Sequence, residues 1–301
     1  MREAMLERNS IQWEENAKAN ALWAILTDHN KRSKAWDPEE FFRTGHTEVS
    51  NVFHYMQSVG ISIPEGGSFL DFGCGVGRAT RALMARFDRG YGVDVSDTMI
   101  SLANKYSATD ARKPAYIVNK VASLNAITDN AIDFVYSHIV IQHIPKPLQP
   151  VFIGEFMRVL RPGGIAAFQV PTEDLTPHAA LVIRSVKSLA KRILPNLFIR
   201  RIRMLLGRGS VTADVSMEMN IVSFDIIQNL IDKCGCELLS APCTNSTSTR
   251  HGGNIKFMSR EEGIAAIRNK ETDSSLLSQF FFVRKKRSCE NGQTKLAARR
   301  K

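Results

Sequence analysis

The chain has 301 residues, of which 44% are hydrophobic, and this is enough to bury one full α/β core with appended segments. No apolar run of about 18 residues occurs, and the charged start of the chain does not resemble a signal sequence, so we expect a cytosolic protein. The net charge of +10 is uneven: Lys and Arg number 18 against 18 Asp and Glu up to Val170, and 22 against 12 beyond it. We therefore expect the second part to meet a substrate, a membrane or a partner, unless its basic residues form only a solvated face.

Helical patterns dominate the first 63 residues. Apolar residues recur at helical spacing up to Asn30, which predicts a first helix. A capping residue followed by a proline, Asp37-Pro38, predicts the start of a second helix. A further helix is predicted from about Thr47 to Val59. We expect residues 1–63 to form a helical cap.

From residue 64 onward, strand and helix patterns alternate. Strands are predicted at Ser68–Phe72, Gly90–Asp94, Ala115–Asn119, Ala131–Ser137, Gly164–Val170, Cys236–Pro242 and Gln279–Arg284. Helices are predicted near Gly77–Arg86, Thr98–Tyr106, Leu148–Leu160 and Phe224–Cys234. This alternation predicts an α/β fold with a mostly parallel sheet and helices on both faces. We expect the domain to span residues 64–286, with a basic helical insertion at 171–222 and a disordered basic tail at 287–301.

The stretch "FLDFGCGVGRAT" leads a predicted strand into a helix through three alternating glycines. Such a turn is typical of nucleotide binding at a helix N-terminus. A dinucleotide site requires Gly-x-Gly-x-x-Gly, and Arg78 stands where its third glycine would be. The carboxylate of Asp71, before the glycines, suits an ammonium group and would repel a pyrophosphate. Asp94, at the end of the next strand, can accept hydrogen bonds from both ribose hydroxyls. Together the two acids favour S-adenosylmethionine over NAD.

Four blocks in order carry a family resemblance: "LDFGCGVGR", "GVDVS", "NAIDFVYSHIVIQHI" and "VLRPGGIAAFQV". The sequence resembles the class I S-adenosylmethionine-dependent methyltransferases from about Gly66 to Val170, and more loosely to Arg284. This resemblance implies a Rossmann-like sheet of seven strands, with S-adenosylmethionine as the cofactor. It implies cofactor contacts for Asp71, Gly73, Cys74, Gly75, Gly77, Asp94, Val95, Met99, Val121, Ala122 and Ser137. Family members usually carry an acid after the third strand; it is missing here, and Asn119 or the backbone of Val121 would take its place at the adenine.

Two histidines follow the predicted fourth strand and are the candidate catalytic residues. If the methyl acceptor is a hydroxyl, a general base assists the transfer. His143 is the first candidate, and its alternative role is packing against the turn at Pro145. His138 is the second candidate and lies nearer to the cofactor strand. No metal site is predicted.

Two further segments bear on the acceptor. Phe41, Phe42 and Arg43 resemble a cap found in some small-molecule members of the family, and they either close over the methionine end of the cofactor or bury the cap against the sheet. The insertion carries eight Lys and Arg and no acid between residues 177 and 209. It is interpreted as a lid, as a membrane-surface helix pair through 178–208 that delivers a lipid-like acceptor, or as a nucleic-acid groove. The last is least favoured because Phe198 is its one aromatic residue.

These patterns predict a methyltransferase that acts on a small or lipid-linked metabolite, at oxygen. We expect it in the cytoplasm or peripherally bound at the inner membrane surface. The alternatives are an RNA methyltransferase that uses the basic second part, and a cofactor-binding partner subunit without catalysis of its own.

Overall fold

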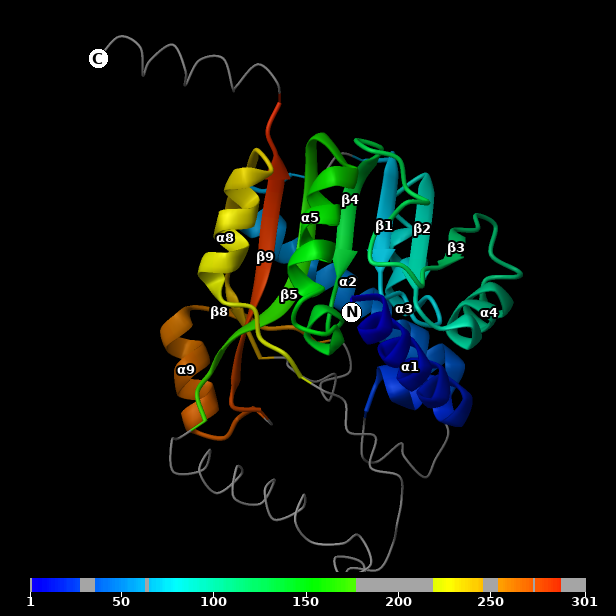
Figure 1. Ribbon diagram of the computed structural model, residues 1–301, viewed down its shortest axis with the longest axis horizontal. Helices are drawn as coiled ribbons and strands as arrows, with labels where there is room; N and C mark the ends of the chain where they lie inside the picture. The colour runs from blue at the N-terminus through cyan, green and yellow to red at the C-terminus, as the bar shows by residue number, and fades with distance from the viewer. Residues whose placement is uncertain are drawn as a thin grey trace, which may run out of the picture.

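A mixed β-sheet forms the centre of the computed structural model, which describes residues 2–27, 36–62, 65–176, 219–245, 254–272 and 274–287 (Figure 1). Its strands are β1 (Ser68–Phe72), β2 (Arg89–Asp94), β3 (Ala115–Val118), β4 (Ile132–Ser137), β5 (Leu160–Asp174), β6 (Cys236–Ser240), β7 (Cys243–Thr244), β8 (Phe257–Met258) and β9 (Leu276–Lys285). The strand order is β3-β2-β1-β4-β5-β9-β7-β8, and β6 also pairs with β9. Strands β1 to β5 are parallel and β9 is antiparallel to β5. The predicted mostly parallel, Rossmann-like class is confirmed, with two short strands, β7 and β8, beyond the seven expected.

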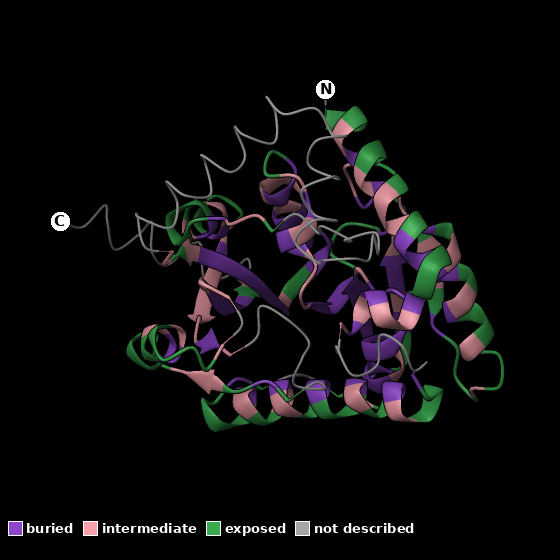
Figure 2. Cartoon of the chain, turned by 90° about the horizontal axis from the view of Figure 1, so that it is seen from below, coloured by how far each residue is buried: buried purple, intermediate pink, exposed green. Residues whose placement is uncertain are grey.

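Helices cover both faces of the sheet. They are α1 (Arg2–Ile25), α2 (Pro38–Ser58), α3 (Arg78–Leu83), α4 (Asp97–Tyr106), the 3-10 turn η2 (Ile141–His143), α5 (Gln149–Val159), α8 (Phe224–Lys233) and α9 (Arg260–Arg268). One core cluster joins the sheet to α5 and α8, and a second joins its other face to α2 and α3. Figure 1 shows α5 and α8 in front of the sheet and α2 behind it. Exposed residues gather on the outer sides of the helices (Figure 2), as burial of one apolar face requires.

Helix α2 is one continuous helix, so the prediction of a separate helix from Thr47 to Val59 was wrong. The predicted start is confirmed, because the side chain of Asp37 accepts a hydrogen bond from the backbone N–H of Glu40. Gly45 lies inside the helix. A Cβ at Gly45 would lie 2.3 Å from the carbonyl oxygen of Arg78. The glycine therefore serves the close packing of α2 on α3.

Because of this contact, we expect Gly45→Ala to destabilise the protein, whereas this replacement inside a helix usually stabilises one. Alanine in a helix interior normally stabilises a protein by about 0.5–1 kcal/mol relative to glycine. At Gly45 the added methyl would collide with backbone, and we expect the free energy of unfolding to fall by about 1–3 kcal/mol, the usual range for overpacking. Gly154 in α5 is the matched control, since a Cβ there would meet no atom within 4 Å. Gly154→Ala should raise the free energy of unfolding in the same urea titration; a gain at Gly45 as well would contradict the packing argument.

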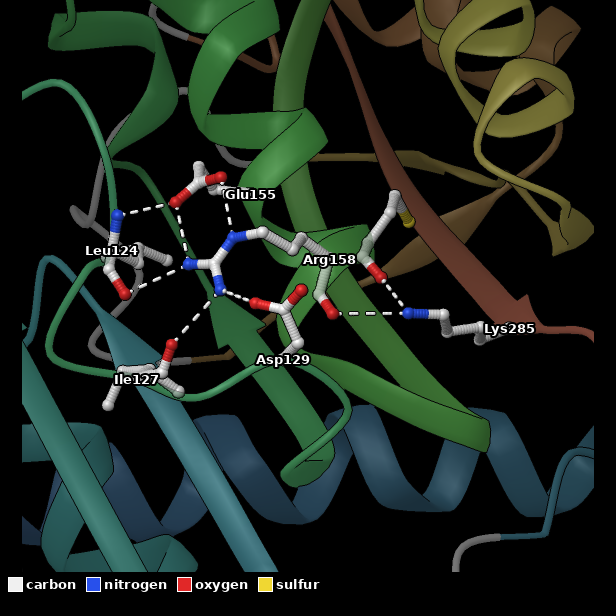
Figure 3. Close-up of polar contacts among 7 residues, drawn as sticks. Leu124, Ile127, Asp129, Glu155, Arg158 and Lys285 are labelled. Carbon is white, nitrogen blue, oxygen red and sulfur yellow. Dashed lines mark hydrogen bonds and ion pairs between the residues drawn. The ribbon is translucent and has the colours of Figure 1, made fainter.

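An arginine cluster fixes the loop between β3 and β4 (Figure 3). The guanidinium of Arg158 donates to both carboxylate oxygens of Glu155, each at 2.8 Å, and to the backbone oxygens of Leu124 and Ile127. Glu155 also accepts from the backbone N–H of Leu124 at 2.6 Å. The cluster thus anchors the loop between β3 and β4 to α5.

Parts of the predicted domain organisation fall on residues that the structure describes. Strand β5 continues to Asp174, four residues past its predicted end at Val170, because residues 171–174 extend its pairing with β9. The described residues begin again at Met219, near the end of the predicted insertion. There the backbone N–H of Asn220 donates to the carbonyl oxygen of Gln142. Residues 178–208 and the tail from residue 288 lie outside the described residues. Among the described helices, none is long and apolar enough to cross a membrane.

Candidate cofactor and acceptor site

A cavity of about 230 Å³ lies where strands β1, β2 and β4 end. Ligands of open α/β sheets bind at this edge, at the point where the strand order reverses between β1 and β4. Seven of the predicted site residues line the cavity: Gly73, Gly75, Asp94, Val95, Met99, His138 and His143. The topology therefore brings the ends of β1 and β2, which carry predicted cofactor residues, and both candidate bases to one cavity.

The glycine turn after β1 has the backbone geometry that its sequence requires. The N–H groups of Gly73 and Cys74 both donate to the carbonyl oxygen of Val93, at 2.7 and 3.0 Å, which ties the turn to β2. Gly73 and Gly77 have φ of +75° and +85°, values that side chains other than glycine's rarely adopt. The turn thus presents its backbone to the cavity, and helix α3 begins directly after it.

The carboxylate of Asp94 is oriented by the backbone on both sides. One oxygen accepts from the N–H of Gly75 at 2.9 Å and the other from the N–H of Ser96 at 3.0 Å. Each oxygen keeps a second lone pair for a ligand hydroxyl. Burial raises the pKa of Asp94, and these backbone hydrogen bonds oppose the rise. The residue is therefore built to accept a pair of hydroxyl groups, as a ribose offers.

Asp71 lies behind the turn. Its side chain is buried and accepts a hydrogen bond from the hydroxyl of Thr80 at 2.6 Å. Burial raises the pKa of Asp71 to about 7. Asp71 does not line the cavity, nor do Cys74, Gly77, Val121, Ala122 and Ser137. Of these, Ser137 is buried and donates to the carbonyl oxygen of Phe72, whereas Val121 is half exposed.

Arg78 is a site residue that the sequence pattern did not single out for binding. It lines the cavity although it is only 6% exposed. One terminal nitrogen donates to Glu48 at 2.5 Å and the other to Thr44 at 3.3 Å. Its Nε atom is buried and has no hydrogen-bond partner among the described residues. An unmatched guanidinium donor at the cavity fits a carboxylate ligand, such as the methionine carboxylate of S-adenosylmethionine.

The two histidines have different surroundings. His138 Nδ1 lies 3.0 Å from a carboxylate oxygen of Glu48, and its side chain is 3% exposed. His143 is less buried; its Nε2 lies 3.2 Å from the amide nitrogen of Gln142, and its ring packs edge-on against Trp13. A carboxylate thus faces the ring of His138, whereas an aromatic ring faces that of His143.

Helix α1 covers the cavity from the solvent side. Asn9 donates to the carbonyl oxygen of His143 at 2.8 Å, and Ser10 donates to that of Val95 at 3.2 Å. Glu14 accepts hydrogen bonds from Ser96 and Thr98 at the start of α4; although burial acts against it, these bonds lower the pKa of Glu14 to about 2. The helix is therefore attached to both strand ends that flank the site. It was predicted as a helix, but its place over the cavity was not.

The cap residues Phe41, Phe42 and Arg43 do not line the cavity. Phe41 and Phe42 are buried in a cluster with Trp36 and the helix α1, and Arg43 is exposed. The structure thus favours the second of the two expected roles, burial of the cap. Asn119, named as a substitute for the missing acid, does line the cavity.

A parallel sheet with a glycine turn after β1 and an oriented carboxylate after β2 is the arrangement that the resemblance to class I S-adenosylmethionine-dependent methyltransferases implies. Residues 70–168 match the family model described as "Methyltransferase domain". The chain therefore carries a methyltransferase domain of this class, and its cofactor is S-adenosylmethionine.

Several curated relatives and solved structures are similar to parts of this chain. It is 29% identical over 159 residues to 2-methyl-6-phytyl-1,4-hydroquinone methyltransferase of Synechocystis sp., covering 51% of this chain and 47% of that protein. It is 26% identical over 160 residues to a ubiquinone biosynthesis O-methyltransferase of Idiomarina loihiensis, covering 52% and 60%. The chain spans about half the length of the curated relatives it matches. Magnesium protoporphyrin IX methyltransferase from Synechocystis superposes with a TM-score of 0.49 at 16% identity, covering 85% of this chain and 91% of that one.

Proposed function

We propose that the protein transfers the methyl group of S-adenosylmethionine to an oxygen atom of a small or lipid-linked metabolite. The observation that carries this proposal is one cavity lined by the glycine turn, by Asp94 and by two histidines. The names of the relatives support the acceptor class, since they include a hydroquinone methyltransferase and an O-methyltransferase of ubiquinone biosynthesis.

The residues of the cavity divide into parts suited to the parts of the cofactor. Asp94 would accept from the ribose hydroxyls, and the backbone of the glycine turn would lie along the methionine and ribose. Val95, Met99 and Asn119 would contact the adenine, the first two through apolar packing. The Nε–H of Arg78 would donate to the methionine carboxylate. The bound cofactor supplies an activated methyl group on a sulfonium centre.

The remaining task of the chain is to hold the acceptor in line with this methyl group, exclude water and receive a proton. Helix α1 excludes water because it covers the cavity and is hydrogen-bonded to the strand ends on both sides. A histidine ring near neutral pH can take the proton of an acceptor hydroxyl. Both His138 and His143 line the cavity, and we assign the proton to His138 because a buried carboxylate faces its ring.

A methyl-transfer census tests this function. The protein is incubated with methyl-labelled S-adenosylmethionine and cell extract, and organic-soluble, small aqueous, protein and nucleic-acid fractions are separated. We expect label in one of the first two fractions, and none with Asp94→Ala. Label in nucleic acid would show instead an RNA or DNA methyltransferase that uses the basic second part. Cofactor binding with no label in any fraction would indicate a cofactor-binding subunit.

A further inference from the structure

We propose that Glu48 is a positioning residue for His138: it holds the hydrogen of the neutral ring on Nδ1, so that Nε2 carries the lone pair that takes the proton of the acceptor hydroxyl. This inference rests on the proposed function and adds to it a residue of helix α2, outside the segment that matches the family model. No motif in the sequence marks Glu48.

Glu48 is a carboxylate in a closed, polar cluster. It is 1% exposed, and one of its oxygens lies 3.0 Å from His138 Nδ1 and 2.5 Å from a terminal nitrogen of Arg78. Its other oxygen accepts from the hydroxyl of Tyr136 at 2.8 Å. Burial alone would raise the pKa of Glu48, but Arg78 and His138 hold it well below its ordinary value. The group is therefore an anion at any pH at which the protein works.

An anionic acceptor beside Nδ1 decides between the two tautomers of the neutral imidazole. With the hydrogen on Nδ1, the ring donates to Glu48; with the hydrogen on Nε2, a lone pair of Nδ1 would face a carboxylate at 3.0 Å. The first arrangement is attractive and the second is repulsive. A carboxylate that fixes a histidine tautomer in this way is the orienting partner of many catalytic bases.

The backbone next to His138 is also held in an unusual conformation. Ile139 has φ of +58°, which is rare for a β-branched side chain. Its N–H donates to the side-chain oxygen of Gln169 at 3.0 Å, and Gln169 is fully buried and hydrogen-bonded to Ser278. Such strain persists where the surrounding structure enforces it, most often at functional sites. His138 is thus fixed from its backbone as well as from its ring.

The proton-transfer step balances with the groups present. The acceptor oxygen forms a bond to the methyl carbon while the carbon–sulfur bond breaks and its electron pair stays on sulfur. The hydroxyl proton passes to Nε2 of His138, which becomes an imidazolium. Glu48 from α2 faces this ring, and the ionisable groups that interact with Glu48 in turn are Arg78 from α3, Tyr136 from β4 and Asp71 from β1. Glu48 neutralises the charge of Arg78 and stabilises the imidazolium by direct contact.

The first test is spectroscopic and needs no acceptor. Protein labelled with ¹⁵N-histidine is examined by NMR above the pH at which His138 loses its proton, with His138→Asn to assign the signals. We expect Nδ1 to carry the hydrogen in the wild-type protein and the population to shift toward Nε2–H in Glu48→Gln. Tyr136→Phe keeps the carboxylate beside Nδ1 and should leave the tautomer unchanged. A wild-type ring with its hydrogen on Nε2 would overturn the proposal, even if the Glu48 variant does not fold.

The second test uses turnover of the fraction labelled in the census. Glu48→Gln should lower kcat by about 10² or more at saturating cofactor and acceptor, the lower end of what a general base contributes. Cofactor affinity is measured separately by calorimetry, because Glu48 also pairs with Arg78. The pH–rate profile of the variant should lose the limb that reports the histidine. Glu237→Gln is the control, because it breaks a glutamate–arginine pair with Arg284, neither of which lines the cavity, and it should leave the profile intact. An unchanged kcat in Glu48→Gln would disprove the positioning role, whereas a wild-type protein without any transfer would disprove the proposed function itself.

Discussion

Replacement of Asp94 by alanine should weaken S-adenosylmethionine binding by about 100-fold or more. Two hydrogen bonds from ribose hydroxyls to a carboxylate contribute about 1.5–3 kcal/mol each, and 1.4 kcal/mol corresponds to a factor of ten. The substitution also removes the acceptor for the N–H groups of Gly75 and Ser96, which leaves the glycine turn less well held. Titration calorimetry with the cofactor measures the loss directly.

Asp97 provides the control for this experiment. It lies three residues further along, its side chain is 60% exposed, and it pairs with Lys120 at the surface. Asp97→Ala should leave the dissociation constant within about twofold, since exposed ion pairs contribute little. Equal losses in the two variants would mean that Asp94 acts through general charge and does not contact the ribose.

Asp71→Asn should stabilise the protein at neutral pH. Burial raises the pKa of Asp71 in the folded state to about 7, from an unfolded value of 3.8. The unfolded chain releases this proton more readily, so the stabilisation that Asp71 contributes is complete below pH 3.8 and is lost as the pH rises through about 7. The loss is on the order of 4 kcal/mol at the upper end, because each pKa unit corresponds to about 1.4 kcal/mol. Asparagine keeps an oxygen that can accept from Thr80 and has no charge to bury.

Thermal melting of the wild type and of Asp71→Asn between pH 4 and pH 8 tests whether the variant is the more stable protein. The melting temperature of the variant should exceed that of the wild type at pH 8, and the difference should vanish near pH 4, where the wild-type carboxyl is also protonated. A variant that melts lower at pH 8 would mean that Asp71 is stabilised as an anion in the folded protein. The pH 4 measurement serves as the internal control for any change in packing.

Five of the eleven predicted cofactor residues line the cavity, and these five lie at or shortly after the ends of neighbouring parallel strands. The glycines, Asp94 and the strand ends are close in the chain, and parallel topology alone brings them together. The acceptor half depends on contacts between distant residues, such as Glu48 with His138. In the sequence Glu48 has the features of an ordinary surface acid on a helix, but in the structure it is buried where α2 packs against α3.

Two other features, the position of Arg78 and helix α9, were not predicted from the sequence, for different reasons. Arg78 was weighed only as the residue that replaces a dinucleotide-type glycine, although an arginine directly after such a turn must lie near its ligand. Helix α9 was not predicted, but its sequence did carry a signal. Ser259 and Glu262 form a capping box at its start, in the serine-x-x-glutamate spacing that marks helix N-termini.

The close packing of α2 on α3 has a consequence for how this chain can be divided into parts. The domain that the family model recognises begins at residue 70, yet the counter-ion of Arg78 comes from residue 48, and Gly45 holds the two backbones together. Without α2, the guanidinium beside the cofactor would be a buried charge without its anion. Helix α2 of this chain therefore cannot be removed without also removing the carboxylate that pairs with Arg78.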